Sequence, residues 1–135
     1  MKNLQITAYM QHFIRQQVMP GDICIDATMG NGNDTALLSQ LAGKRGRVLA
    51  FDIQKQALEH TKERLKRDNC PENYQLLLES HENMDVYAEE ETVSCITFNL
   101  GYLPGGDHSV ATRADSSIRA VESGLKLLNK GGLMT

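Results

Sequence analysis

Short apolar runs alternate with segments of helical periodicity along most of this chain, and this alternation restricts the fold more than any other feature. The apolar runs cover residues 23–27, 48–53, 74–78 and 93–99, and helical spacing covers residues 35–41, 54–68 and 113–129. Because a strand, a crossover helix and a second strand form a parallel unit, the pattern predicts an open sheet. The expected fold class is therefore α/β, with a mostly parallel sheet and helices on both faces.

The two ends of the chain extend this pattern. Apolar residues at helical spacing from Ile6 to Val18 predict an opening amphipathic helix. Near the other end, Leu133 starts a fifth strand close to the last residue. We expect a single domain over residues 1–135, truncated after the start of that strand, with its C-terminal strands missing.

Two of the predicted helices should each bury one apolar face, and the acidic stretch that ends at residues 89–91 should be a surface loop or a frayed helix. In residues 54–68 the buried face is expected to hold Ala57, Leu58, Thr61 and Leu65. In residues 113–129 it is expected to hold Ile118, Val121, Leu125 and Leu128.

Composition describes an ordinary soluble protein, with 41% hydrophobic and 23% charged residues. No window approaches ~18 consecutive apolar residues, so no membrane partner is expected. The three cysteines are odd in number and lack metal-ligand spacing, so no metal site and a cytoplasmic protein are expected. Cys24 and Cys95 lie inside apolar strand-like runs, which predicts buried thiols. The net charge of −3 does not indicate a nucleic-acid partner, but basic runs at residues 44–47 and 62–67 leave RNA open.

A glycine-bearing loop follows the first apolar run, at the edge of the sheet where open α/β folds bind their ligands. Glycines let the backbone turn sharply and approach a ligand, and the N–H groups at the start of the next helix favour an anionic group. The candidate cofactor-binding residues here are Asp26, Thr28, Gly30, Asn31, Gly32, Asn33 and Asp34. A plain strand-to-helix turn is the alternative interpretation.

Position 35 argues against a dinucleotide ligand. The dinucleotide fingerprint has a third glycine at this point, beside the pyrophosphate, but this chain has Thr35. The missing glycine, together with the acidic residue that opens the motif, suits the amino-acid end of S-adenosylmethionine better.

Two further strand ends supply candidate cofactor contacts. Asp52, followed by Ile53 and Gln54, ends the second run and could accept hydrogen bonds from both ribose hydroxyls of an adenosine. Its alternative role is to cap the following helix. Ser80 and His81 follow the third run, in the region that would flank the adenine, although a lone histidine is more often structural.

The loop after the fourth run is the most distinctive stretch of the chain. Asn99 offers a carbonyl acceptor for the hydrogens of an amine, and Tyr102 offers a flat face on which a base could stack. Asp107 and His108 are candidates to take a proton. These four residues are the candidate catalytic set, and a glycine-rich surface turn is the alternative.

These residues resemble the motifs of class I methyltransferases, which use S-adenosylmethionine and have a Rossmann-like fold. Residues 26–32 resemble the first motif of that class, and Asp52 resembles the second. Residues 99–102 resemble a variant of the Asn/Asp-Pro-Pro-Tyr motif of amino-group methyltransferases, with Leu100 and Gly101 in place of the two prolines.

A narrower resemblance covers essentially the whole chain. The motifs D-A-T-M-G-N-G-N-D, F-D-I-Q, E-S-H-E-N-M and N-L-G-Y-L-P-G-G-D-H-S-V-A-T-R-A-D-S are similar to those of the bacterial family named "putative rRNA methylases". The resemblance implies methyl transfer from S-adenosylmethionine to the exocyclic amine of 5-aminomethyl-2-thiouridine at the tRNA wobble position, with the anticodon region of tRNA as the partner. That family continues past the fifth strand.

The resemblance also implies roles for individual residues. Positions that match expected cofactor contacts are Asn31, Asn33, Asp52, Gln54, Ser80 and His81, and positions that match the acceptor side are Asn99, Tyr102, Asp107 and His108. Rival interpretations are a small-molecule N- or O-methyltransferase, a module that binds S-adenosylmethionine without catalysis and, last, a dinucleotide oxidoreductase. The sequence does not fix the oligomeric state and leaves a homodimer open.

Overall fold

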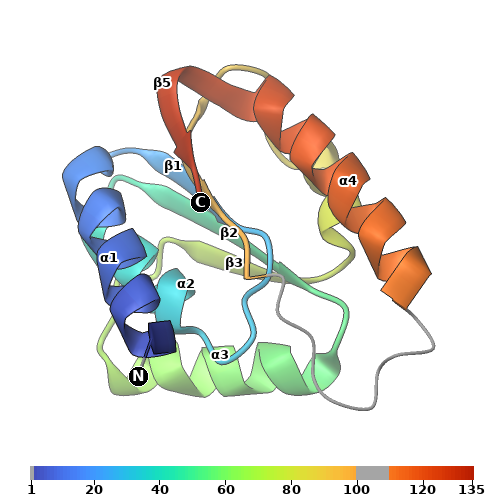
Figure 1. The fold of residues 1–135 in the computed structure, drawn as a ribbon. Helices are drawn as coiled ribbons and strands as arrows, with labels where there is room; N and C mark the ends of the chain where they lie inside the picture. The colour runs from blue at the N-terminus through green and yellow to red at the C-terminus, as the bar shows by residue number, and fades with distance from the viewer. Residues whose placement is uncertain (1, 100–109) are drawn as a thin grey trace.

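Parallel strands form one twisted sheet with helices on both faces, as the sequence predicts (Figure 1). The computed structural model describes the backbone of residues 2–99 and 110–135, and side chains within residues 8–99 and 115–135. In that part of the chain the strands are β1 (Ile23–Asp26), β2 (Arg47–Asp52), β3 (Tyr74–Leu78), β4 (Val93–Thr97) and β5 (Leu128–Met134), in the order β3-β2-β1-β4-β5. The helices are α1 (Lys2–Gln17), α2 (Asn33–Ala42), α3 (Lys55–Arg67) and α4 (Val110–Leu127), with a 3-10 helix, η1 (His81–Val86).

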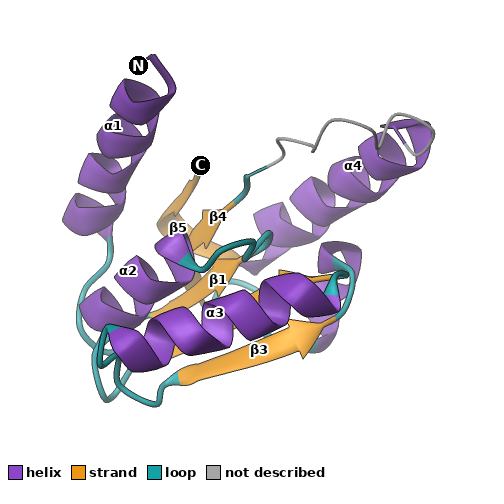
Figure 2. Ribbon diagram, turned by 90° about the horizontal axis from the view of Figure 1, so that it is seen from below, coloured by secondary structure: helices purple, strands orange, loops and turns teal. Residues whose placement is uncertain are grey.

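Alternate residues of the central strands face two separate cores. Cys24 and its partner Cys95 are buried with α1 and α2, whereas the next residues, Ile25 and Ile96, are buried with η1 and α4. Figure 1 shows α3 and α4 on opposite sides of the sheet, and Figure 2 shows α2 and α3 together in front of the strands. The predicted burial of the two strand cysteines is confirmed, and burial raises the pKa of the Cys24 thiol to about 12.

The first and third helices form where their periodicity predicts them. Helix α3 buries Ala57, Thr61 and Leu65, so most of its expected face is confirmed. Helix α1 buries Ile14 among the residues of its expected face, but Tyr9 is 64% exposed. No helix among residues 2–99 and 110–135 is both long and apolar enough to cross a membrane.

Helix α4 buries a different face from the one that its large apolar residues predict. The predicted burial of Ile118 and Leu125 is wrong, because these residues are 58% and 60% exposed. Ala120, Gly124 and Leu127 are buried instead. The small residues let the helix approach the sheet closely, so they define its contact face.

Strand β5 begins earlier than the sequence predicts. The expected helix through residue 129 ends at Leu127, and Leu128 pairs with Val93 of β4. The strand has a register irregularity opposite residues 93–95, and Gly131 has a φ of 84°, which favours glycine. The polar and glycine residues between Leu128 and Leu133 interrupt the apolar pattern, so the sequence does not predict the first part of this strand.

The sheet topology brings four loops to one edge. Because the strands are parallel, the segments that follow β1, β2, β3 and β4 all leave the sheet at the carboxyl edge. Strand β1 lies between β2 and β4. Successive strands are added on one side of β1 up to β3 and on its other side from β4 onward, so the direction of strand addition reverses between β1 and β4. This reversal is the place where open α/β sheets bind ligands.

Candidate functional site

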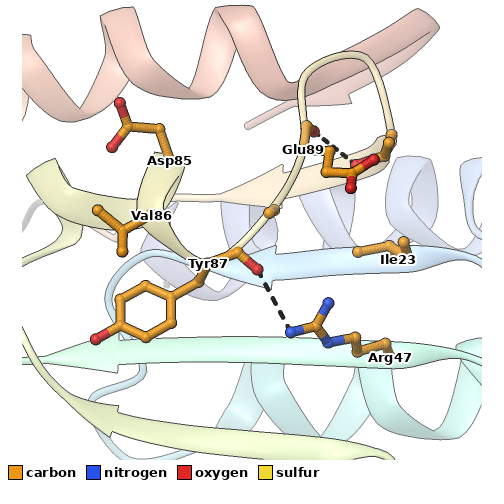
Figure 3. A pocket seen from close by; sticks show the side chains of 8 residues that line it. Ile23, Arg47, Asp85, Val86, Tyr87 and Glu89 are labelled. Carbon is orange, nitrogen blue, oxygen red and sulfur yellow. Dashed lines mark hydrogen bonds between the residues drawn. The ribbon is translucent and has the colours of Figure 1, made fainter.

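A cavity of about 450 Å³ opens at the opposite edge of the sheet and is not the predicted site (Figure 3). Its lining includes Ile23 and Arg47, which begin β1 and β2, and the Arg47 guanidinium donates to the carbonyl of Tyr87 at 3.4 Å. None of the residues predicted to bind a cofactor lines it. The predicted residues gather instead at the carboxyl edge.

The glycine loop that follows β1 turns tightly at that edge. Gly30 and Gly32 have φ angles of 53° and 87°, in the left-handed region. The N–H of Met29 donates to the carbonyl of Phe51 in β2, and the N–H of Gly32 donates back to the carbonyl of Met29. The loop is therefore a defined structure rather than a loose connection between β1 and α2.

Asp26 lies beneath this loop and organises it. Its carboxylate accepts the Thr35 hydroxyl at 2.6 Å and the N–H of Thr28 at 3.2 Å. The carboxyl is 1% exposed, and burial raises its pKa to about 7, although the Thr35 hydrogen bond counters part of that rise. Thr35, which replaces the third glycine of a dinucleotide fingerprint, is thus a partner of Asp26.

Asp52 ties the second loop to the first. One carboxylate oxygen accepts the N–H of Gly30 at 3.2 Å, and the other accepts the N–H of Gln54 at 2.9 Å. The alternative that Asp52 caps α3 is wrong, because the N-cap of that helix is Gln54. A carboxylate offers about four lone-pair sites, so Asp52 keeps acceptor capacity for ribose hydroxyls. Ile53 and Gln54 are exposed beside it.

Asn31 in the glycine loop and Asn33 at the start of α2 face outward. The Asn31 side-chain oxygen accepts the N–H of Asn33 at 3.2 Å, and both residues are exposed. Asp34 is half-buried, and burial raises its pKa while a hydrogen bond from Gln11 of α1 lowers it. Both asparagine side chains are therefore available to a ligand at the mouth of the loop.

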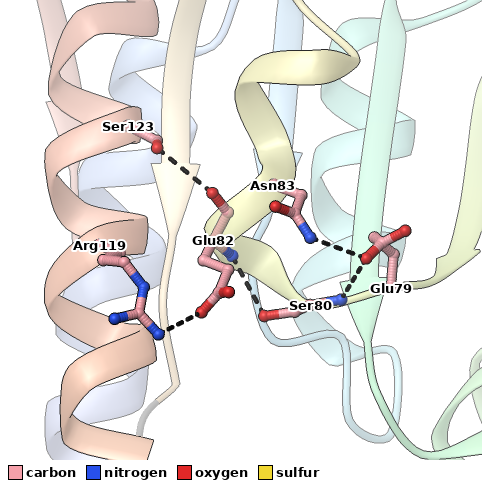
Figure 4. A network of polar contacts seen from close by, with 6 residues as sticks. All are labelled: Glu79, Ser80, Glu82, Asn83, Arg119 and Ser123. Carbon is pink, nitrogen blue, oxygen red and sulfur yellow. Dashed lines mark hydrogen bonds and ion pairs between the residues drawn. The ribbon is translucent and has the colours of Figure 1, made fainter.

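Ser80 and His81 come to this edge in different roles. The Ser80 hydroxyl accepts the N–H of Glu82 and caps η1, and the carbonyl of Glu82 accepts the hydroxyl of Ser123 from α4 (Figure 4). Glu82 also pairs with Arg119 of α4 at 3.1 Å. The expected loop or frayed helix is thus a 3-10 helix docked on α4 over residues 81–86, and the acidic residues 89–91 lie in an exposed turn, as the surface-loop alternative predicts.

His81 sits directly against the end of β1. Its Nδ1 lies 3.0 Å from the carbonyl of Ala27, so Nδ1–H donates, and its ring lies 5.7 Å from the ring of Phe98 at a tilt of 56°. Burial lowers the pKa of His81, and the Ala27 hydrogen bond counters that shift. A neutral ring with a fixed tautomer therefore flanks the loop.

The acceptor side is described only at its beginning. Asn99 follows Phe98 at the end of β4, and its backbone N–H donates to the Thr28 hydroxyl of the glycine loop. Tyr102, Asp107 and His108 lie outside the described residues. The structure thus brings the predicted cofactor-binding residues together with Asn99. The roles of the other three predicted catalytic residues stay predictions.

Sequence reasoning missed two contacts that hold the site. Phe98 lies beside His81, and Thr61 of α3 donates its hydroxyl to the carbonyl of Gly30 at 3.2 Å. The only available signal for Thr61 was its place on the buried face of a helix, where a hydroxyl needs a partner.

Comparison with known proteins agrees with this geometry. A family model described as "Putative rRNA methylase" matches residues 48–135. The Arabidopsis thaliana protein named "tRNA (mnm(5)s(2)U34)-methyltransferase, chloroplastic" is 37% identical over 92% of this chain and 49% of its own length. The chain therefore spans about half the length of this curated relative.

Solved structures extend the comparison. A "putative rRNA-methylase" from Clostridium thermocellum has a TM-score of 0.85 at 42% identity, over 95% of this chain and 68% of that one. A "putative methyltransferase" from Streptococcus mutans, in complex with SAH, has a TM-score of 0.81 at 40% identity, over 95% and 69% of the two chains. The chain thus belongs to the "putative rRNA methylase" family and has the Rossmann-like class I methyltransferase fold.

Proposed function

We propose that this chain transfers a methyl group from S-adenosylmethionine to the exocyclic amine of 5-aminomethyl-2-thiouridine at the wobble position of tRNA. The observation that carries the proposal is the joined pair of loops at the carboxyl edge, where Asp52 holds Gly30 beside exposed asparagines. The names of the relatives described above support the same reaction and an RNA acceptor. In this proposal residues 1–135 act as one cofactor-binding domain.

The donor half of the site fits an adenosine linked to an amino acid. Asp52 would accept the ribose hydroxyls, and His81 with Phe98 would flank the adenine. Asn31 and Asn33 would contact the amino-acid end, near the backbone N–H groups that open α2. Asp26 is buried beneath the loop, so it would act by holding Thr28 and Thr35 in place. When bound, S-adenosylmethionine supplies a reactive sulfonium methyl group.

The acceptor half would align the amine and remove its proton. Asn99 would orient the amine through its side-chain carbonyl, and Tyr102 would hold the uracil ring. A cationic ammonium has no lone pair, so a proton must leave before or during attack, and Asp107 or His108 would accept it. Because the donor is already reactive, the chain mainly contributes alignment and desolvation.

A methyl-transfer assay tests the proposal directly. The acceptor is tRNA from cells that make the aminomethyl wobble base but cannot methylate it, and S-adenosylmethionine carries a labelled methyl group. We expect label at the wobble uridine, and the signal should fall steeply with salt because the acceptor is RNA. Asn99→Ala should lower turnover, while Glu90→Ala, at an exposed turn far from the loops, should not.

Calorimetric titration with S-adenosylmethionine separates the ways in which the proposal could fail. Binding with no transfer to tRNA would exclude the wobble base as the acceptor. Transfer to a free amine without RNA would favour a small-molecule methyltransferase. No binding at all would remove the donor assignment.

A further inference from the structure

Thr61 of α3 contacts the glycine loop, although the two are 31 residues apart in the sequence. Its side chain is fully buried, and its hydroxyl donates to the carbonyl of Gly30 at 3.2 Å. A threonine inside a helix commonly returns its hydroxyl to the carbonyl one turn earlier. Here the described bond leaves the helix and goes to the loop.

The same residue also packs against the second glycine. A Cβ atom added at Gly32 would lie 3.0 Å from the Cα of Thr61 and 3.2 Å from its Cγ2. The backbone of the loop therefore rests directly on Thr61. One residue of α3 thus contacts both glycines, through its hydroxyl at Gly30 and through its backbone and methyl group at Gly32.

Gly30 is consequently held on both sides. Its N–H donates to the carboxylate of Asp52, and its carbonyl accepts the hydroxyl of Thr61. Two fixed partners determine where the peptide groups of a left-handed glycine point. Gly30 itself is exposed, so these partners set the orientation of a segment that a ligand can reach.

We propose that Thr61 is a positioning residue for the methyl donor, acting through its hydroxyl on the glycine loop. The inference rests on the proposed function for the identity of the ligand, and it assigns to α3 a role in donor affinity. The hydroxyl sets the loop orientation, while the methyl group contributes packing. Donor affinity and folding stability therefore depend on different atoms of one side chain.

Two variants separate these atoms. Thr61→Val keeps the shape and removes the hydrogen bond, and the freed Gly30 carbonyl can turn to water because that residue is exposed. Thr61→Ser keeps the hydroxyl and leaves a methyl-sized void in the buried contact. Using S-adenosylhomocysteine as the calorimetric probe, we expect Thr61→Val to bind roughly three- to ten-fold more weakly. Thr61→Ser should bind within about two-fold of the wild-type chain but melt at a lower temperature than Thr61→Val.

Amide hydrogen exchange in the ligand-free chain gives a second measurement. Thr61→Val should speed exchange at the amides of Gly30 and Gly32, and Thr61→Ser should leave it near the wild-type rate. Wild-type affinity and exchange in Thr61→Val, or affinities that simply follow the melting temperatures, would overturn the inference. If the wild-type chain does not bind S-adenosylhomocysteine, the proposed function fails, and exchange alone decides whether Thr61 orders the loop.

Discussion

The hydroxyl of Thr28 accepts the backbone N–H of Asn99, a residue that follows it by 71 positions. Thr28 belongs to the glycine loop after β1, and Asn99 opens the loop after β4. The backbone of Thr28 is in turn held by Asp26. A single chain of hydrogen bonds therefore runs from the buried carboxylate to the first residue of the proposed acceptor loop.

Removing this link should affect turnover more than donor affinity. Thr28→Val leaves the Asn99 N–H without its partner, and we expect roughly a ten-fold loss of kcat, because small misplacements of aligning groups are costly. Thr28→Ser keeps the oxygen and should retain most activity. Single-turnover methyl transfer and calorimetry on the same samples test this, and equal losses of turnover and affinity in Thr28→Val would argue against it.

The two loop glycines should differ in their tolerance of alanine. Both have positive φ angles, so each substitution should lower the free energy of unfolding by about 1–2 kcal/mol. A Cβ at Gly30 has its nearest neighbour at 3.9 Å, whereas one at Gly32 meets the Thr61 backbone at 3.0 Å. Gly32→Ala should therefore cost about 1–3 kcal/mol more than Gly30→Ala in urea unfolding. Equal costs would mean that the contact with α3 is not tight.

Asp26 should make stability depend on pH. Burial raises its pKa from 3.8 to about 7, so between these values the folded chain holds a proton that the unfolded chain has released. The free energy of unfolding should fall as pH rises through this window, by at most ~1.4 kcal/mol per pH unit, and the contribution should level off above the folded pKa. Urea unfolding of the wild-type chain and Asp26→Asn at several pH values isolates this slope. A constant difference between the two would contradict the assignment.

His81 should remain neutral with its proton on Nδ1. Burial lowers its pKa, and the carbonyl of Ala27 can only accept a hydrogen bond, so Nδ1–H must donate. On acidification the ring gains its second proton on Nε2, and the unfolded chain gains it at a higher pH than the folded chain. The stability contributed by neutral His81 is therefore present above the ordinary pKa of histidine and is lost as pH falls through the lowered pKa of the folded chain. Nitrogen-15 NMR of the ring reports both properties, with His81→Gln identifying the signal. A proton on Nε2 in the neutral ring would contradict the prediction.

Helix α4 offers a test of its observed contact face. A Cβ at Gly124 would lie 2.7 Å from Met134 Cε and 3.1 Å from Ile96 Cδ1, so Gly124→Val should lower the free energy of unfolding by about 1–3 kcal/mol. Leu125→Ala, at an exposed neighbour, should cost less than about 0.5 kcal/mol. Urea unfolding ranks the two variants, and the reverse order would restore the face that the large apolar residues predict.

The parts of the fold that follow from apolar runs could be predicted from the sequence. The strand Tyr74–Leu78 agrees with its prediction at both ends. Asp26 and Asp52 end their strands, and the parallel pairing of these strands places both residues at the same edge of the sheet. The face of α4 could not be found in the same way, because the close contact is made by Gly124, which has no side chain to contribute to a periodic pattern.

The sequence predicts which cofactor-side residues gather at the carboxyl edge, but it does not predict the hydrogen bonds among them. Asp52 was expected to meet a ribose or cap a helix, yet its two oxygens hold the backbone of Gly30 and Gln54. Which donor reaches which acceptor depends on how α3 and β2 approach the glycine loop. That approach is fixed by tertiary packing, which no local pattern encodes.

The position of β1 between β2 and β4 separates the proposed cofactor side of the site from the proposed acceptor side. Asp52 and Thr61 hold the glycine loop from the β2 side, whereas the segment that begins at Asn99 leaves the sheet on the β4 side. Under the proposed function, replacing the segment after Asn99 would change the acceptor while leaving the contacts of the glycine loop with Asp52 and Thr61 intact, provided that the hydrogen bond between Thr28 and Asn99 is kept. In the proposed enzyme, the acceptor could therefore change on one side of the central strand without a change of methyl donor on the other.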